Sequence, residues 1–171
     1  MNGMKTLDAE SRAADSPSGD KRELRLWLRL LTCTTLIEGS IRRRLRERFG
    51  ETLPRFDLLA QLAKVPEGMT LSELSRRMMV SNGNLTALVE RLVAAGLIER
   101  QTSPSDRRAQ VVRLSSAGAE AFARMAAEHE GWILQMTAGL TADESEQLMR
   151  LLARLKGSAK AALALPSEET A

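Results

Sequence analysis

Apolar side chains recur every three or four positions from Leu24 onward, the spacing that places them along one face of an α-helix. The pattern runs to residue 45, and Gly50 follows, a residue type that readily adopts the left-handed conformation that ends helices. We therefore predict a long helix that ends near Phe49 and buries one stripe of side chains. The members of that stripe are Leu24, Trp27, Leu28, Leu31, Ile37, Ile41 and Leu45.

A second helix is predicted directly after the first. Thr52 and Pro54 are residue types that suit a helix start, and Pro66 and Gly68 suit its end. Its buried side is expected to consist of Phe56, Leu58, Leu59, Leu62 and Ala63.

The next stretch predicts two helices joined by a tight turn. Thr70 and Glu73 have the spacing of a capping box, in which each side chain satisfies a backbone N–H of the other residue. A short helix is expected from there to Met78. Ser81 is a good N-cap for a further helix that runs to Ala95.

Residues 97–100 and 109–114 alternate apolar and polar side chains, as the two strands of a hairpin do. The loop between them is rich in arginine. After Ser115 the helical period returns for a fifth helix, and Thr141 with Glu144 forms a second capping box before a sixth.

Together these elements predict a mainly α fold with a small β-hairpin wing. The order helix, turn, helix, strand, loop, strand is that of a winged helix-turn-helix, flanked here by long amphipathic helices. Their apolar stripes are too extensive for the small winged unit to cover, which favours mutual burial in a dimer over a helical bundle within one chain. The predicted boundaries are a tail at 1–20, one domain at 21–165 with dimerisation helices at 21–50 and 115–165 and the winged lobe at 52–114, and a tail at 166–171.

Composition excludes several classes of protein. The chain has 171 residues, 43% of them hydrophobic, which is enough for a proper core, but it has no apolar run of membrane-spanning length and no secretory signal. We therefore expect a cytoplasmic protein that does not contact membranes. A single cysteine, Cys33, and a single histidine, His129, argue against an internal disulfide, a metal site and a catalytic triad. We expect no enzymatic activity and no cofactor.

Charge is distributed in two basic regions, although the net charge of +3 is modest. One region is the helix-turn-helix and wing. The other is the end of the first helix, where only Glu38 and Glu47 accompany Arg42, Arg43, Arg44, Arg46 and Arg48.

The second helix of a helix-turn-helix lies in the major groove, with its N-terminal residues against the base edges. In this chain those residues are short and polar, and asparagine pairs well with adenine. The alternative is that Ser81 and Asn82 only cap the helix, which leaves Asn84 and Thr86 unexplained. The residues predicted to contact DNA are Ser81, Asn82, Asn84, Thr86, Arg91, Arg107 and Arg108.

The loop of the hairpin gives an independent indication. Pro104 stiffens it, and Asp106 lies two positions from Arg108, where its carboxylate can orient the guanidinium. An arginine held in this way can enter a narrow minor groove, and Arg107 would serve a phosphate. The alternative is a hairpin tip with solvated charges.

The run from Leu71 to Ser115 resembles the MarR family of bacterial transcription regulators, through the segments VSNGNLTALVERLVAAGLIER, SPSDRR and LSSAG. The resemblance covers residues 22–163, and the wing signature Asp-x-Arg of the family falls on Asp106 and Arg108. It implies a homodimer that binds a pseudo-palindromic operator in double-stranded DNA, usually as a repressor, with recognition helices roughly 34 Å apart.

Residues 25–62 and the segment LSRRMMVSNGN resemble the branch of the family that responds to hydroxycinnamates or their coenzyme A thioesters and controls aromatic catabolism. That resemblance implies a small-molecule effector, an aromatic acid or an aromatic acyl-CoA, which releases the protein from DNA. The residues predicted to bind it are Trp27, Arg42, Arg43, Arg44, Arg46, Arg48 and Phe56.

Other interpretations remain open for these positions. Trp27 and Phe56 also suit a protein core, and the arginines suit a solvated helix face or contacts to phosphate. Cys33 suits a small core residue better than a redox sensor, and His129 suits a buried or interface position. A different effector, oxidation of Cys33, or an interaction adaptor that does not bind DNA are the competing functions. An enzyme acting on acyl-CoA would need a paired nucleophile and base, which the sequence lacks.

Overall fold

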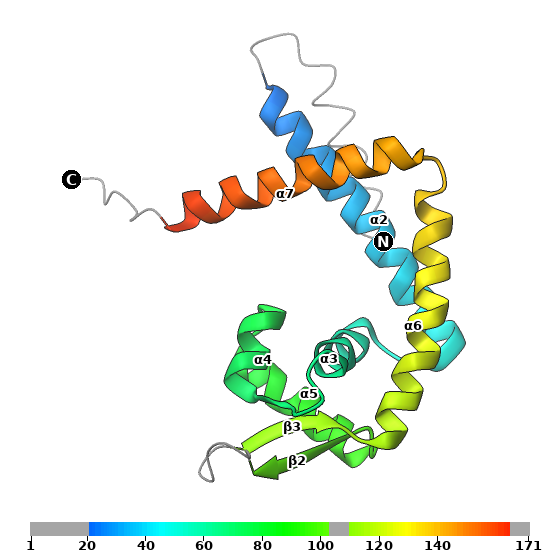
Figure 1. The fold of residues 1–171 in the computed structure, drawn as a ribbon, viewed down its shortest axis with the longest axis vertical. Helices are drawn as coiled ribbons and strands as arrows, with labels where there is room; N and C mark the ends of the chain where they lie inside the picture. Colours follow the sequence, from blue (N-terminus) through cyan, green and yellow to red (C-terminus); the bar gives the residue numbers. More distant parts are fainter. Residues whose placement is uncertain (1–20, 103–109, 165–171) are drawn as a thin grey trace, which may run out of the picture. The chain divides into compact units, whose positions relative to one another are not determined.

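The computed structural model describes residues 21–102 and 110–164. The chain divides into two compact units, residues 1–132 and residues 133–171, and each is described by itself. The elements in chain order are α2 (Arg22–Phe49), α3 (Leu53–Ala63), β1 (Met69–Thr70), α4 (Leu71–Met78), α5 (Asn82–Ala94), β2 (Ile98–Thr102), β3 (Gln110–Leu114), α6 (Ser116–Thr137) and α7 (Ala142–Ala164) (Figure 1). The predicted helices and hairpin strands are therefore all present, and α3 ends at Ala63, before Pro66, as predicted.

The strands form a three-stranded antiparallel sheet in the order β1-β3-β2, rather than the predicted two-stranded hairpin. In the register Met69 faces Val112 and Thr70 faces Val111. Gly68 makes this approach possible, because a Cβ on it would lie 2.7 Å from the carbonyl oxygen of Val112. The sheet thereby ties the start of α4 to the strands that carry the wing.

The core of the first unit lies between this sheet and the helices α3, α4 and α5, which gather beside it (Figure 1). Its residues are almost all aliphatic. Those with at most 2% of their surface exposed include Leu45, Leu58, Leu59, Leu62, Met69, Leu74, Leu85, Val89, Leu92, Ile98 and Val112. Three of them come from α5, so that one side of this helix is fixed in the core.

The helix ends agree with the predicted signals at most positions. Gly50 is left-handed, with a φ of 66°, and closes α2. The Oγ1 atom of Thr70 accepts from the backbone N–H of Glu73, but the carboxylate of Glu73 accepts from Arg77 at 2.6 Å. The prediction that the Glu73 carboxylate accepts from the backbone N–H of Thr70 was therefore wrong. Arg77, one turn later, offers this carboxylate a charged donor instead.

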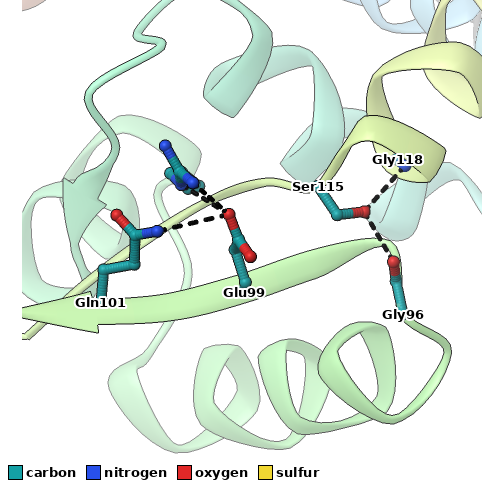
Figure 2. A network of polar contacts seen from close by, with 6 residues as sticks. Gly96, Glu99, Gln101, Ser115 and Gly118 are labelled. Carbon is teal, nitrogen blue, oxygen red and sulfur yellow. Dashed lines mark hydrogen bonds and ion pairs between the residues drawn. The ribbon is translucent and has the colours of Figure 1, made fainter.

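Ser115 joins three elements at the point where β3 meets α6 (Figure 2). Its Oγ atom donates to the carbonyl of Gly96 at 2.6 Å and accepts from the backbone N–H of Gly118 at 3.0 Å. Gly118 is packed so closely that a Cβ on it would lie 1.8 Å from the carbonyl oxygen of Leu97. The end of α5, the hairpin and the start of α6 are thus held at one junction.

The predicted buried stripe of α2 is only partly buried. Ile41 and Leu45 are buried, whereas Leu24, Trp27 and Leu31 are exposed. In the single chain the prediction was therefore wrong for the N-terminal half of α2. Side chains of α6 contact the C-terminal end of this helix, where Phe49 and Arg44 lie against Trp132.

The second unit contains the end of α6 and the whole of α7. Thr141 and Glu144 form the predicted capping box: the backbone N–H of Thr141 donates to the carboxylate of Glu144 at 2.8 Å, and that of Glu144 donates to Thr141 Oγ1 at 3.3 Å. The hydrogen bonds from Thr141 lower the pKa of Glu144. Over its 23 residues α7 buries none. Its exposed large apolar residues are Leu148, Met149, Leu151, Leu152, Leu155 and Leu163.

Candidate nucleic-acid interface

The first turn of α5 presents polar groups to solvent. Ser81 is the N-cap, and its Oγ atom accepts from the backbone N–H of Asn84 at 3.5 Å. Asn84 is exposed and Thr86 is half-buried. Ser81 therefore has the capping role that the alternative interpretation gave it, and Asn84 is left as a polar side chain in water at the helix start. The structure gives the backbone position of Asn82 but does not describe its side chain.

The turn that leads into α5 contains a feature that the sequence did not reveal. Met79 has a φ of 55°, in the left-handed region, and 90% of its surface is exposed. Glycine and asparagine are the usual residues at such a position, so a methionine gives no sequence signal for it.

The arginines near α5 fall into two groups. Arg76 and Arg91 are exposed. Arg77 pairs with Glu73 at 2.6 Å, and Arg113 pairs with Glu99 at 2.6 Å across the hairpin. The second pair is used to hold the strands together, since these two residues face each other in the register of β2 and β3.

The tip of the wing, with the predicted Asp106, Arg107 and Arg108, lies outside the described residues. The strands that carry it are well connected. The carboxylate of Glu99 accepts from both Arg113 and Gln101, at 2.6 and 3.4 Å (Figure 2).

A small hollow opens beside α5. It has a volume of about 230 Å³ and a mostly apolar wall with one amide and one guanidinium. Its lining consists of Pro54, Met78, Val80, Asn84, Leu85, Leu88 and Arg91.

Comparison with known proteins shows which protein family has this sequence pattern and fold. The sequence model of the MarR family matches residues 49–109. Among solved structures, Sco3205, a MarR family transcriptional regulator from Streptomyces coelicolor in complex with DNA, aligns with 90% of this chain and 95% of its own, at 26% identity and a TM-score of 0.72. The chain is therefore similar to MarR-family regulators, in sequence over these residues and in fold over most of its length.

Two curated proteins that are similar to this chain are also transcription regulators. The transcriptional activatory protein BadR of Rhodopseudomonas palustris is 32% identical over 110 residues, 62% of each protein. The HTH-type transcriptional regulator YdgJ of Bacillus subtilis is 28% identical over 109 residues, 64% of this chain and 66% of the relative. The matches thus span less than two thirds of either relative. MarR-family proteins are transcription regulators and not enzymes.

The predicted effector residues of this chain do not form one cluster. Trp27 is 56% exposed near the start of α2, about 22 Å along the helix axis from Arg42. Arg42 pairs with Glu38, and Arg48 lies 3.5 Å from Glu128. Arg43 and Arg46 are exposed. Only a long ligand can reach from Trp27 to these arginines.

Aromatic side chains gather where α2, α3 and α6 meet. The cluster contains all three phenylalanines, the only histidine and one of the two tryptophans of the chain. Phe56 is 6% exposed, with its ring centroid 4.9 Å from His129 and 5.6 Å from Phe122. The structure therefore places Phe56 in the core, as its alternative interpretation held, and His129 half-buried against it.

Charged groups border this aromatic cluster. The guanidinium of Arg44 lies over the ring of Trp132, 5.8 Å from its centroid. Although Asp57 is exposed as a residue, desolvation of its carboxyl raises its pKa; the charge of Glu38 adds to the rise, while His129 and Arg42 oppose it. A ligand at this end of α2 would meet cationic and aromatic groups together.

Cys33 is exposed, so the prediction of a core residue was wrong for the single chain. It lies on the N-terminal half of α2, which the first unit leaves largely uncovered. In the described part of the chain no three histidine, cysteine, aspartate or glutamate side chains gather as a metal site would need. None of the described helices is both long and apolar enough to cross a membrane.

Proposed function

We propose that this protein is a homodimeric transcriptional regulator of the MarR family that binds a pseudo-palindromic operator in duplex DNA. The observation that carries the proposal is the geometry of α5. One side of the helix is fixed in the core by Leu85, Val89 and Leu92, while its first turn presents Asn84 to solvent. A helix held in this way can place polar groups against base edges without losing its own packing.

The solved relative supports the same proposal. Sco3205 is bound to DNA in its crystal structure, and its similarity to this chain extends over 90% of the residues here. The exposed Arg76 and Arg91 near α5 add positive charge, which attracts the phosphate backbone.

The homodimer is supported by α7. A helix with no buried residue and a stripe of leucines is not stable alone in water, because packing of the apolar face supplies most helix stability. Leucines lie three, four and seven residues after Leu148, at Leu151, Leu152 and Leu155, and so form one stripe along the helix. Helices that pack against a partner have this spacing.

Two substitutions on α5 separate base reading from phosphate binding. Asn84→Ala is expected to weaken binding to a selected operator by about 1–3 kcal/mol and to leave the salt dependence unchanged. Arg91→Ala is expected to weaken binding to all sequences and to reduce the slope of log K against log salt by about one. Fluorescence anisotropy titrations at several salt concentrations measure both quantities.

Arg150→Ala on α7 is the matched control, because it removes the charge of an arginine that is also exposed but belongs to the second unit and not to the winged lobe. It should leave both affinity and slope unchanged. Wild-type affinity in the Asn84→Ala protein would instead favour an interaction adaptor that does not use this helix on DNA.

We infer that the effector is an aromatic acid or its coenzyme A thioester. The support is the end of α2, where Arg44 lies over Trp132 and Arg46 and Arg48 follow within one turn. Guanidinium groups bind carboxylates and phosphates, and aromatic rings pack against an aromatic acyl group.

Thermal unfolding with a panel of aromatic acids, their thioesters and coenzyme A itself tests the effector. A true effector at about 100 times its Kd should stabilise the fold by about 2.7 kcal/mol, or raise Tm by about 5–10 °C. Arg44→Ala should reduce the shift for the thioester, with Arg150→Ala as control. Failure of every compound to raise Tm would refute this effector class and leave the DNA proposal standing.

A reporter assay gives the sign of regulation. The family resemblance favours a repressor that the effector releases, whereas the relative BadR is named an activatory protein. A reporter placed behind the selected operator should be less active when the protein is present if the protein is a repressor.

A further inference from the structure

Met79 is the most exposed of the large apolar residues that the structure describes, with 90% of its surface in solvent. It also has a positive φ of 55°, which costs an L-residue energy that glycine would avoid. The position therefore carries two unfavourable features that a glycine would remove. Strained residues of this kind persist where the surroundings determine their conformation, and they concentrate at functional sites.

The turn around Met79 is firmly held. The backbone N–H groups of Met79 and Val80 both donate to the carbonyl of Ser75, the latter at 3.2 Å. The hydroxyl of Ser75 donates to the carbonyl of Val80 at 2.6 Å. Ser81 then caps α5. The exposure of Met79 thus follows from a hydrogen-bonded backbone turn and is not the result of a loose loop.

The residues near Met79 in sequence are typical of a surface that binds DNA and less typical of a protein–protein interface. Val80 beside it is 37% exposed, Ser81 and Asn84 follow at the start of α5, and Arg76 precedes it on α4. A single exposed apolar side chain among polar and cationic groups suits a ligand that carries many negative charges and a few exposed methyl groups. In the major groove the C5-methyl of thymine is the apolar group that base pairs present.

We propose that Met79, with Val80, contacts the C5-methyl group of a thymine in each operator half-site and so determines specificity at that base pair. The inference rests on the proposed DNA binding and extends it to residues outside α5. Met79 supplies an unbranched, polarisable side chain that can follow the groove surface, and the fixed turn limits the entropy lost on contact.

Replacement of thymine by deoxyuridine removes only the methyl group and so tests the contact directly. A duplex is first selected from a random pool with the full-length wild-type protein. Each thymine is then replaced in turn. We expect one position per half-site at which deoxyuridine weakens wild-type binding about fourfold, the value for one buried methyl group. Met79→Ala should bind the thymine duplex about as weakly as wild type binds the deoxyuridine duplex, and should not distinguish the two.

Further variants separate this contact from a structural role. Met79→Gly relieves the positive φ, so it should raise Tm by about 2–4 °C and still lose the preference for thymine. Val80→Ala should weaken the preference, whereas Val93→Ala, which has the same 37% exposure near the other end of α5, should not.

The outcomes distinguish a failure of the thymine contact from a failure of DNA binding as a whole. Selection of no duplex would overturn the proposed DNA binding, and this contact with it. A selected duplex whose deoxyuridine forms all bind like the parent, or an equal preference for thymine in wild type and Met79→Ala, would overturn the contact alone.

Discussion

Gly118→Ala is expected to destabilise the protein by at least about 3 kcal/mol. The new Cβ would lie 1.8 Å from the carbonyl oxygen and 2.8 Å from the carbonyl carbon of Leu97. Both atoms belong to the backbone, so no rotamer change can relieve the overlap, and forced overpacking of this kind costs about 1–3 kcal/mol or more. The displacement would also separate Ser115 from Gly96 and Gly118, and the start of α6 would lose its cap. Urea unfolding followed by circular dichroism measures the loss.

Gly131→Ala is the matched control in the same helix. No heavy atom lies within 4 Å of a Cβ placed there, so alanine should stabilise the helix by up to about 1 kcal/mol. Opposite signs for the two substitutions are expected. Equal stability of Gly118→Ala and wild type would show that the junction of α5, β3 and α6 is not packed as described.

Leu152→Asp on α7 is expected to abolish the dimer and to lower operator affinity by about 100-fold or more. A carboxylate in an apolar interface must be desolvated without a partner, which is costly. A monomer would then bind one half-site without the gain of about 10²–10⁴ that a linked second site provides. Sedimentation measures the oligomeric state, and anisotropy titration measures the affinity.

Ala153→Asp introduces the same charge on the side of α7 away from the leucine stripe, at a position that is also exposed. It should leave the dimer intact and operator affinity close to wild type. A Leu152→Asp protein that remains dimeric would show that α7 does not carry the interface.

Periodicity predicted the helices well because each of them has one apolar side over several turns. It did not reveal β1, since two residues have no period and Met69 pairs with Val112, far away in sequence. It also could not show what covers a stripe. Leu24 and Trp27 lie on the predicted face of α2 and are exposed in the single chain, while Ile41 and Leu45 on the same face are buried.

The candidate DNA surface was predictable where it depends on residue type and helix position. Asn84 lies exposed on the first turn of α5, and Ser81 has the capping role that its residue type suggests. Met79 was missed because its left-handed conformation is set by hydrogen bonds to Ser75 and not by the residue itself. Phe56 was named for the effector from a resemblance, but its contacts with Phe122 and His129 make it a core residue.

Selection of duplexes from a random pool with the full-length protein is the most direct test of operator recognition by a dimer through α5. We expect the enriched sequences to be pseudo-palindromic, with half-site centres one helical turn of about 10–10.5 base pairs apart or a multiple of it. Their affinity should fall steeply as salt is raised, and Asn84→Ala should bind them more weakly. Enrichment of no sequence, or of a single unrepeated site bound equally well by Asn84→Ala, would show that the protein does not recognise an operator as a dimer through α5.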